Sequence, residues 1–147
     1  MARLMAAVAA GAAMLAFSGC GGDNESEQEK EAEAGRGTIT CSGDALEGSP
    51  GLPAGFPELE GVTFVKQEDK GPTDVVDGFS DESLEGLYNE YKERLKEEEY
   101  TILFDELEDE DSEISYKSKD GETEGQIALR ATCDNGNVSV HITARPA

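Results

Sequence analysis

The stretch ISYKSKDGETEGQIALRATCDNGNVSVHIT, residues 114–143, decides the fold of this chain. It holds three runs in which apolar and polar residues alternate, as in half-buried β-strands. The runs are separated by Asp120-Gly121 and Asn135-Gly136. Both dipeptides favour tight hairpin turns because their residues tolerate positive φ. The stretch therefore predicts a three-stranded antiparallel sheet.

Each turn sets a register for the strands beside it. The first pairs Ile114 with Ile127 and Tyr116 with Gly125, and the second pairs Leu129 with Ile142. Because side chains alternate between the faces of a strand, both registers place the same residues on one face. This predicted inward set is Ile114, Tyr116, Ile127, Leu129, Ala131, Cys133, Val138, Val140 and Ile142.

The opposite face of these strands is polar, and we expect it to face solvent. It carries Thr132, Ser139, His141 and Thr143. His141 is the single histidine of the chain. A general base needs an aimed partner, and no serine elbow or acid at a diagnostic spacing accompanies it. We therefore interpret His141 as an ordinary surface residue.

One helix is predicted upstream of these strands. Ser80 is a suitable N-cap, and the acids that follow it suit the positive end of the helix dipole. Apolar residues then recur at helical spacing, and β-rich sequence resumes after about Glu99. The apolar face consists of Leu84, Leu87, Tyr88, Tyr91 and Leu95.

The remaining strands complete the predicted domain. Residues 62–66 and 73–79 read as strands around a hairpin loop at 68–71, and residues 100–104 are also β-rich. Thr38–Cys41 is a short β-like segment. We expect residues 38–147 to form a single α+β domain, an antiparallel β-sheet with one amphipathic helix packed on one face, in the order ββαββββ. The strand order within the sheet is left open.

The first nineteen residues have the composition of a secretory signal peptide. Arg3 precedes an uncharged, mostly apolar run from Leu4 to Phe17. That run would span about 21 Å as a helix, short of the hydrocarbon core of about 30 Å. Phe17-Ser18-Gly19-Cys20 resembles the lipobox of bacterial lipoproteins, with Phe17 where that family usually has leucine. The resemblance implies cleavage before Cys20 and lipidation of its thiol.

Two other fates of the leader are weighed against lipidation. Cleavage by the ordinary signal peptidase lacks an A-x-A site at the end of the apolar run. Retention as an uncleaved anchor is disfavoured by the short run and its single basic flank. We expect a lipid-anchored, extracytoplasmic protein of the cell membrane or the outer membrane. Gly21 resembles outer-membrane sorting if the host has two membranes.

Residues 20–37 are predicted to be a lipidated N-terminus followed by a disordered acidic tether. From Gly21 to Gly37 the sequence has no aromatic or branched aliphatic residue, so it cannot bury enough apolar surface to offset chain ordering. The whole chain has 33 acidic and 12 basic residues, a formal charge of −21. This charge disfavours nucleic acid and favours a basic protein or cations as partners, besides the membrane reached through the lipid anchor.

The chain has three cysteines, Cys20, Cys41 and Cys133. With Cys20 assigned to lipid, Cys41 and Cys133 remain as an even pair in an oxidising compartment. A thiol nucleophile, a redox role or a metal role would call for a C-x-x-C pair or a nearby histidine, which the sequence lacks. We predict a structural Cys41–Cys133 disulfide.

The densest acidic run, residues 105–113, offers weak metal-ligand candidates in Asp109, Asp111 and Glu113. Their alternate spacing suits a calcium loop, but Ile114 stands where the sharp turn needs glycine. We expect a solvated loop with at most weak cation binding, and no cofactor.

The function hypothesis follows from the anchor, the tether and the lack of a catalytic motif. We expect a membrane-anchored extracytoplasmic lipoprotein whose domain is a non-catalytic binding or interaction module, not an enzyme. The alternatives are a small cell-envelope hydrolase that uses acidic residues, and an inhibitor or accessory subunit that docks a basic partner.

Overall fold

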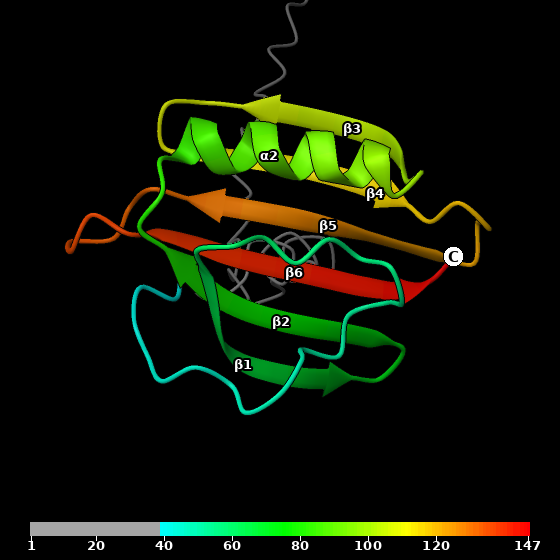
Figure 1. Ribbon diagram of the computed structural model, residues 1–147, viewed down its shortest axis with the longest axis horizontal. Helices are drawn as coiled ribbons and strands as arrows, with labels where there is room; N and C mark the ends of the chain where they lie inside the picture. The colour runs from blue at the N-terminus through cyan, green and yellow to red at the C-terminus, as the bar shows by residue number, and fades with distance from the viewer. Residues whose placement is uncertain (1–38) are drawn as a thin grey trace, which may run out of the picture.

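A computed structural model of the chain describes residues 39–147 (Figure 1). Within this range the chain forms a six-stranded antiparallel sheet and one helix, so the predicted α+β class and element order are confirmed. The predicted leader, Cys20 and the tether lie outside the described residues. The elements are β1 (Val62–Lys70), β2 (Thr73–Ser80), α2 (Leu84–Glu97), β3 (Thr101–Leu107), β4 (Asp111–Lys117), β5 (Thr123–Arg130) and β6 (Val138–Pro146).

The strands lie in the order β1-β2-β6-β5-β4-β3, and every neighbouring pair is antiparallel. The last strand in the sequence, β6, thus occupies the interior of the sheet, between the first hairpin and the β3–β5 meander (Figure 1). Buried side chains of α2 and of the sheet belong to one hydrophobic core. Residues 39–41, predicted to be β-like, lie in no strand.

The register predicted for the β4–β5 hairpin is confirmed. Ile114 lies opposite Ile127, and Tyr116 lies opposite Gly125. The strands end at Lys117 and Thr123, so the turn around Asp120-Gly121 is wider than a two-residue loop. The Asp120 carboxylate accepts hydrogen bonds from the Ser118 hydroxyl and the Glu122 amide, which lower the pKa of Asp120 and brace this turn.

The register predicted for β5 and β6 is wrong by two residues. Leu129 lies opposite Val140 and not Ile142, because β5 ends at Arg130 and a loop of residues 131–137 precedes β6. A shift of two residues keeps every side chain on its predicted face, since the side-chain period of a strand is two. Two members of the inward set lie in the loop and not in a strand: Ala131 is exposed, and Cys133 is buried but is not part of the core cluster.

The helix begins three residues later than predicted. Its N-cap is Ser83, whose hydroxyl accepts the Gly86 amide at 3.1 Å. Ser80 is instead the last residue of β2, buried and opposite Val138. The helix ends at Glu97, and Glu99 then takes a positive φ of 61° as the chain turns into β3.

Two predicted loops are largely strand. Glu68, Asp69 and Lys70 belong to β1, so the first turn falls at Gly71-Pro72. The acidic run is not a loop from end to end either, since β3 extends to Leu107 and β4 begins at Asp111. Ladder pairing with a neighbouring strand has outweighed the low strand propensity of acidic residues.

Tyr116 and Gly125 form a close contact within the core. A Cβ at position 125 would lie 1.9 Å from the Thr143 carbonyl oxygen and 2.5 Å from the Tyr116 hydroxyl oxygen. That hydroxyl donates to the Thr143 carbonyl at 2.8 Å. The Tyr116 ring also packs against Phe56 and Tyr100, with centroids 5.2 and 5.6 Å away. Glycine at position 125 therefore gives this aromatic group its space.

We predict that Gly125→Ala lowers the free energy of unfolding by about 3 kcal/mol or more, the range of severe overpacking. Tyr116→Phe keeps the ring and loses one hydrogen bond, so it should cost about 1 kcal/mol. Urea unfolding followed by circular dichroism measures both. Equal losses in the two variants would contradict the steric explanation.

The predicted disulfide between Cys41 and Cys133 is present, with the two Cα atoms 5.6 Å apart and 92 residues apart in sequence. The adjacent backbone is held as well, because the Cys41 carbonyl accepts hydrogen bonds from the side-chain amides of Asn135 and Asn137. The disulfide therefore joins the first described residues to the loop that precedes β6.

We predict that reduction of this bridge lowers the free energy of unfolding by about 2–5 kcal/mol, because the unfolded chain regains the entropy of a long loop. Thermal unfolding of the oxidised and reduced protein measures the difference. The double variant Cys41→Ser with Cys133→Ser should match the reduced protein and should not respond to reductant. A response to reductant in that variant would contradict the assignment.

Candidate functional site: a buried aspartate–histidine pair

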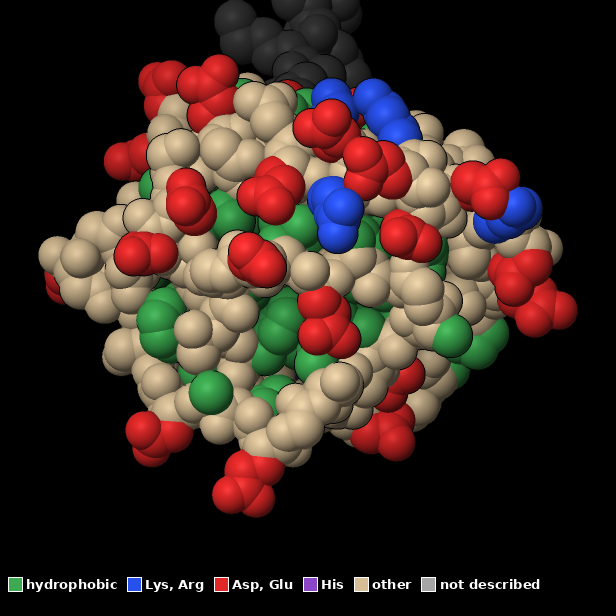
Figure 2. Space-filling view, in the orientation of Figure 1, with side chains coloured by type: hydrophobic (Ala, Val, Ile, Leu, Met, Phe, Trp, Pro, Cys, Tyr) green, Lys and Arg blue, Asp and Glu red, His purple; other side chains and the backbone are tan. Residues whose placement is uncertain are grey.

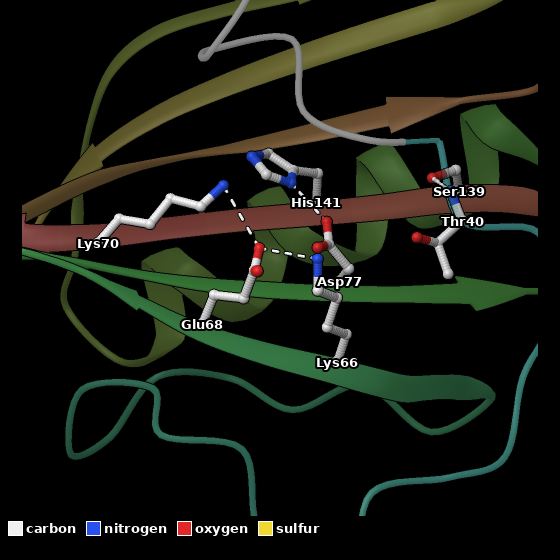
Figure 3. A network of polar contacts seen from close by, with 7 residues as sticks. All are labelled: Thr40, Lys66, Glu68, Lys70, Asp77, Ser139 and His141. Carbon is white, nitrogen blue, oxygen red and sulfur yellow. Dashed lines mark hydrogen bonds and ion pairs between the residues drawn. The ribbon is translucent and has the colours of Figure 1, made fainter.

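Asp77 and His141 form a buried polar pair on the sheet face opposite the inward set (Figure 3). They lie directly opposite each other on β2 and β6. Asp77 Oδ1 is 2.6 Å from His141 Nδ1, and the two side chains are only 3% and 5% exposed. The pair depends on β6 lying beside β2, since the two residues are 64 positions apart in sequence.

The prediction of a solvent-facing histidine is therefore wrong. Ser139 is also buried, Thr143 is half-buried, and only Thr132 of the four predicted surface residues is exposed. Alternation assigned these residues to the correct face, but alternation does not show whether a face is covered. One signal was present in the sequence, namely an aspartate within the apolar run Val75–Phe79.

Charged side chains of β1 lie next to the pair (Figure 3). Lys66 lies opposite Asp77, and its ammonium is 2.8 Å from the Glu68 carboxylate. Lys70 lies 3.4 Å from the same carboxylate. Hydrogen bonds from the lysines, that of Lys66 first, lower the pKa of Glu68, and the pKa of Lys66 is raised by Glu68 and, to a smaller extent, by Asp77. The two lysines and Glu68 thus form an exposed ionic group beside the buried pair.

His141 Nε2 is buried and has no hydrogen-bond partner among the described residues. In the tautomer whose Nδ1 carries the hydrogen and donates a hydrogen bond to Asp77, Nε2 has a free lone pair. Such a nitrogen can accept a proton or bind a metal ion. Either activity needs a further group at Nε2, a nucleophile or additional ligands.

The described residues bring no such group to the pair. The neighbouring hydroxyl, that of Ser139, accepts the backbone amide of Thr40 at 2.8 Å. Residues 39–147 contain no cluster of three or more histidine, cysteine, aspartate or glutamate side chains arranged to hold a metal ion. Across the strand from His141 on β5 lies Ala128, which offers no polar atom.

The weak metal candidates do not converge. Asp109 lies in the turn between β3 and β4, whereas Asp111 and Glu113 lie on β4. Asp111 lies opposite Arg130, and the Glu113 carboxylate accepts a hydrogen bond of 3.1 Å from the side-chain amide of Gln126. Asp111 and Glu113 thus face residues of β5, whereas Asp109 lies apart from them in the turn.

A hollow of about 470 Å³ has Glu98, Tyr100 and Asp120 in its lining. A glycosidase-type mechanism needs one carboxylic acid whose pKa is raised, so that it stays protonated. The Asp120 carboxylate has a lowered pKa, as do Glu68 and Asp105. Asp120 is thus suited to bracing its turn and not to acting as a general acid.

Comparison with known proteins assigns no family to this chain. No family model, curated protein or solved structure matches it. None of the helices in residues 39–147 has the length and apolar character needed to cross a bilayer.

We predict that Asp77 and His141 are coupled in stability by about 1–3 kcal/mol, as expected for two buried side chains in contact. Each single change to alanine leaves one buried polar group without its partner. The free energies of unfolding of Asp77→Ala, His141→Ala and the double variant measure the coupling. Asp69→Asn, at an exposed carboxylate of β1, is the control and should change stability by less than about 0.5 kcal/mol. Additive effects of the two single changes would show that the pair is not a unit.

Proposed function

We propose that this chain is a lipid-anchored extracytoplasmic protein whose folded domain is a non-catalytic binding module. The observation that carries the proposal is the Cys41–Cys133 disulfide. Structural disulfides persist in oxidising compartments, outside the cytosol. A signal segment that ends in a lipobox-like Cys20 agrees with that location and supplies an anchor.

The start of the folded domain suits attachment to a tether. Thr40 donates its amide to Ser139, and Cys41 is bonded covalently to Cys133. Any pull from the preceding chain would therefore be passed to the loop before β6 and to β6 itself, in the interior of the sheet. A tethered domain held in this way resists unravelling from its N-terminal end.

The three described carboxylates whose pKa is shifted offer no support for the hydrolase alternative. Hydrogen-bond donors lower the pKa of Glu68, Asp105 and Asp120, which favours the ionised form. A hydrolase that uses acidic residues needs the opposite shift at one acid. The Asp77–His141 pair contributes a polar brace between β2 and β6 in this proposal.

Which membrane holds the lipid anchor depends on whether the host cell has one membrane or two. In a host with two membranes, Gly21 after the lipidated cysteine resembles outer-membrane sorting. In a host with one membrane, the domain would face outward from the cell membrane.

We predict that membrane-extracted protein lacks residues 1–19, carries an acylated Cys20 and contains one intramolecular disulfide. Intact-mass measurement before and after reduction tests all three features. Cys20→Ser should keep its leader and carry no lipid, whereas the control Cys41→Ser should still be cleaved and acylated. A native protein that retains Met1 and is recovered in the aqueous phase would overturn the proposal.

A further inference from the structure

The two edge strands of the sheet, β1 and β3, differ in whether another segment covers them. On β1, Leu46 donates its amide to the Phe64 carbonyl at 2.8 Å, and Gly51 donates to the Gln67 side chain at 2.9 Å. The loop before β1 therefore shields that edge. At the other end of the sheet lies β3, and no described strand pairs with its outer side.

The backbone groups on the outer side of β3 follow from the hydrogen-bond pattern. Glu108 donates its amide to the Asp111 carbonyl at 2.8 Å, which makes these residues a hydrogen-bonded pair. Such pairs alternate along an antiparallel ladder, so Glu106 with Glu113 is the next one. The N–H and C=O groups of Asp105 and Leu107 therefore point away from β4. They are in the orientation that binds an added strand.

The side chains of β3 are unusually apolar for an open edge. Leu103, Phe104 and Leu107 are 57%, 49% and 39% exposed, and they make up most of the exposed large hydrophobic residues of residues 39–147. Natural edges are commonly protected by lysine, proline or a covering loop. On β3 the protective features are a bulge between Ile102 and Phe104 and the charges of Asp105 and Glu106.

The charge around this edge is strongly negative. Glu106 lies directly opposite Glu113, and the turn after β3 is Glu108-Asp109-Glu110. Two lysines of α2 lie near Asp105: Lys92 is bonded to its carboxylate, which also accepts the Tyr88 hydroxyl, and Lys96 interacts with it electrostatically. Figure 2 shows how far acidic side chains outnumber basic ones on the face that carries α2.

We propose that the outer edge of β3 binds an extended segment of a basic protein as a seventh strand, with lysine or arginine alternating with apolar residues. This inference rests on the proposed binding function and names its surface and partner chemistry. Main-chain hydrogen bonds to Asp105 and Leu107 set the register. Because side chains alternate between the faces of a strand, the apolar ones lie on the α2 face, beside Leu107, and the basic ones lie on the other face, beside Phe104 and Glu106.

Charge selects this occupant over the two nearest alternatives. A second copy pairing through β3 would bring two sets of these carboxylates together, and like charges across strands are destabilising. The segment from Gly21 to Gly37 of the same chain has six acidic and two basic residues, and it lacks β-branched residues. A basic segment relieves the repulsion that both alternatives increase.

The test uses the mature, full-length protein in a non-ionic detergent and a labelled peptide in which lysine and valine alternate over seven residues. Fluorescence anisotropy should show binding that weakens as salt rises, because the charges are screened. A peptide with glutamate in place of lysine should not bind. A peptide with its central valine replaced by proline should bind about tenfold more weakly, because a ladder donor is lost.

Leu107→Pro and Leu107→Val are a matched pair of protein variants. Both change the side chain, but only proline removes the outward N–H, at an edge position where proline is tolerated. We expect an about tenfold loss of affinity for Leu107→Pro and little change for Leu107→Val. Thermal unfolding verifies that Leu107→Pro is folded, and Asp105→Pro is the second variant if it is not.

Three outcomes would overturn the proposal. These are the absence of peptide binding, equal binding of the proline-interrupted peptide, and equal affinities of the two Leu107 variants. A dimer that dissociates on Leu107→Pro would assign the edge to a second copy instead. The intact-mass test of the anchor is independent of all these results, so failure here is distinguishable from failure of the proposed function.

Discussion

The pairing of β6 on both of its sides is the constraint on which the rest of this structure depends. The last strand lies between β2 and β5, so it joins a hairpin formed early in the chain to a meander formed later. The contact between Asp77 and His141, the bond from Tyr116 to the Thr143 carbonyl and the bond from Thr40 to Ser139 all involve β6. With β6 in the interior of the sheet, β3 lies at one of its edges.

The two faces of the sheet have different chemistry because β6 contributes to both. Its inward residues Val138, Val140 and Ile142 join the core that includes α2. Its other face places Ser139 and His141 in polar contacts that are nearly closed to solvent. The Asp77–His141 contact adds a buried polar interaction between β2 and β6 to the backbone pairing of these two strands.

The two edges of the sheet differ in how far they are covered. The loop before β1 is linked to the chain end that the disulfide secures, and it shields the edge that it crosses. The β3 edge lies at the opposite end of the sheet and carries exposed apolar side chains within an acidic region. In the proposed function, the domain would be attached beside β6, in the interior of the sheet, and would bind its partner at the β3 edge.

Local sequence determined the order of the elements and the faces of the strands and the helix, and the cysteine count predicted the Cys41–Cys133 disulfide. Period-two alternation and two turn dipeptides identified the strand members of the inward set, whereas Ala131 and Cys133 lie in the loop before β6. The spacing of Leu84, Leu87, Tyr91 and Leu95 identified the helix face. Those patterns depend on neighbours a few residues apart, where periodicity is informative. Tertiary structure alone decided the strand order, the two-residue shift between β5 and β6, the burial of His141 and the open edge at β3. Each of these depends on which distant strand lies alongside, and alternation within one strand is the same whatever its neighbour is.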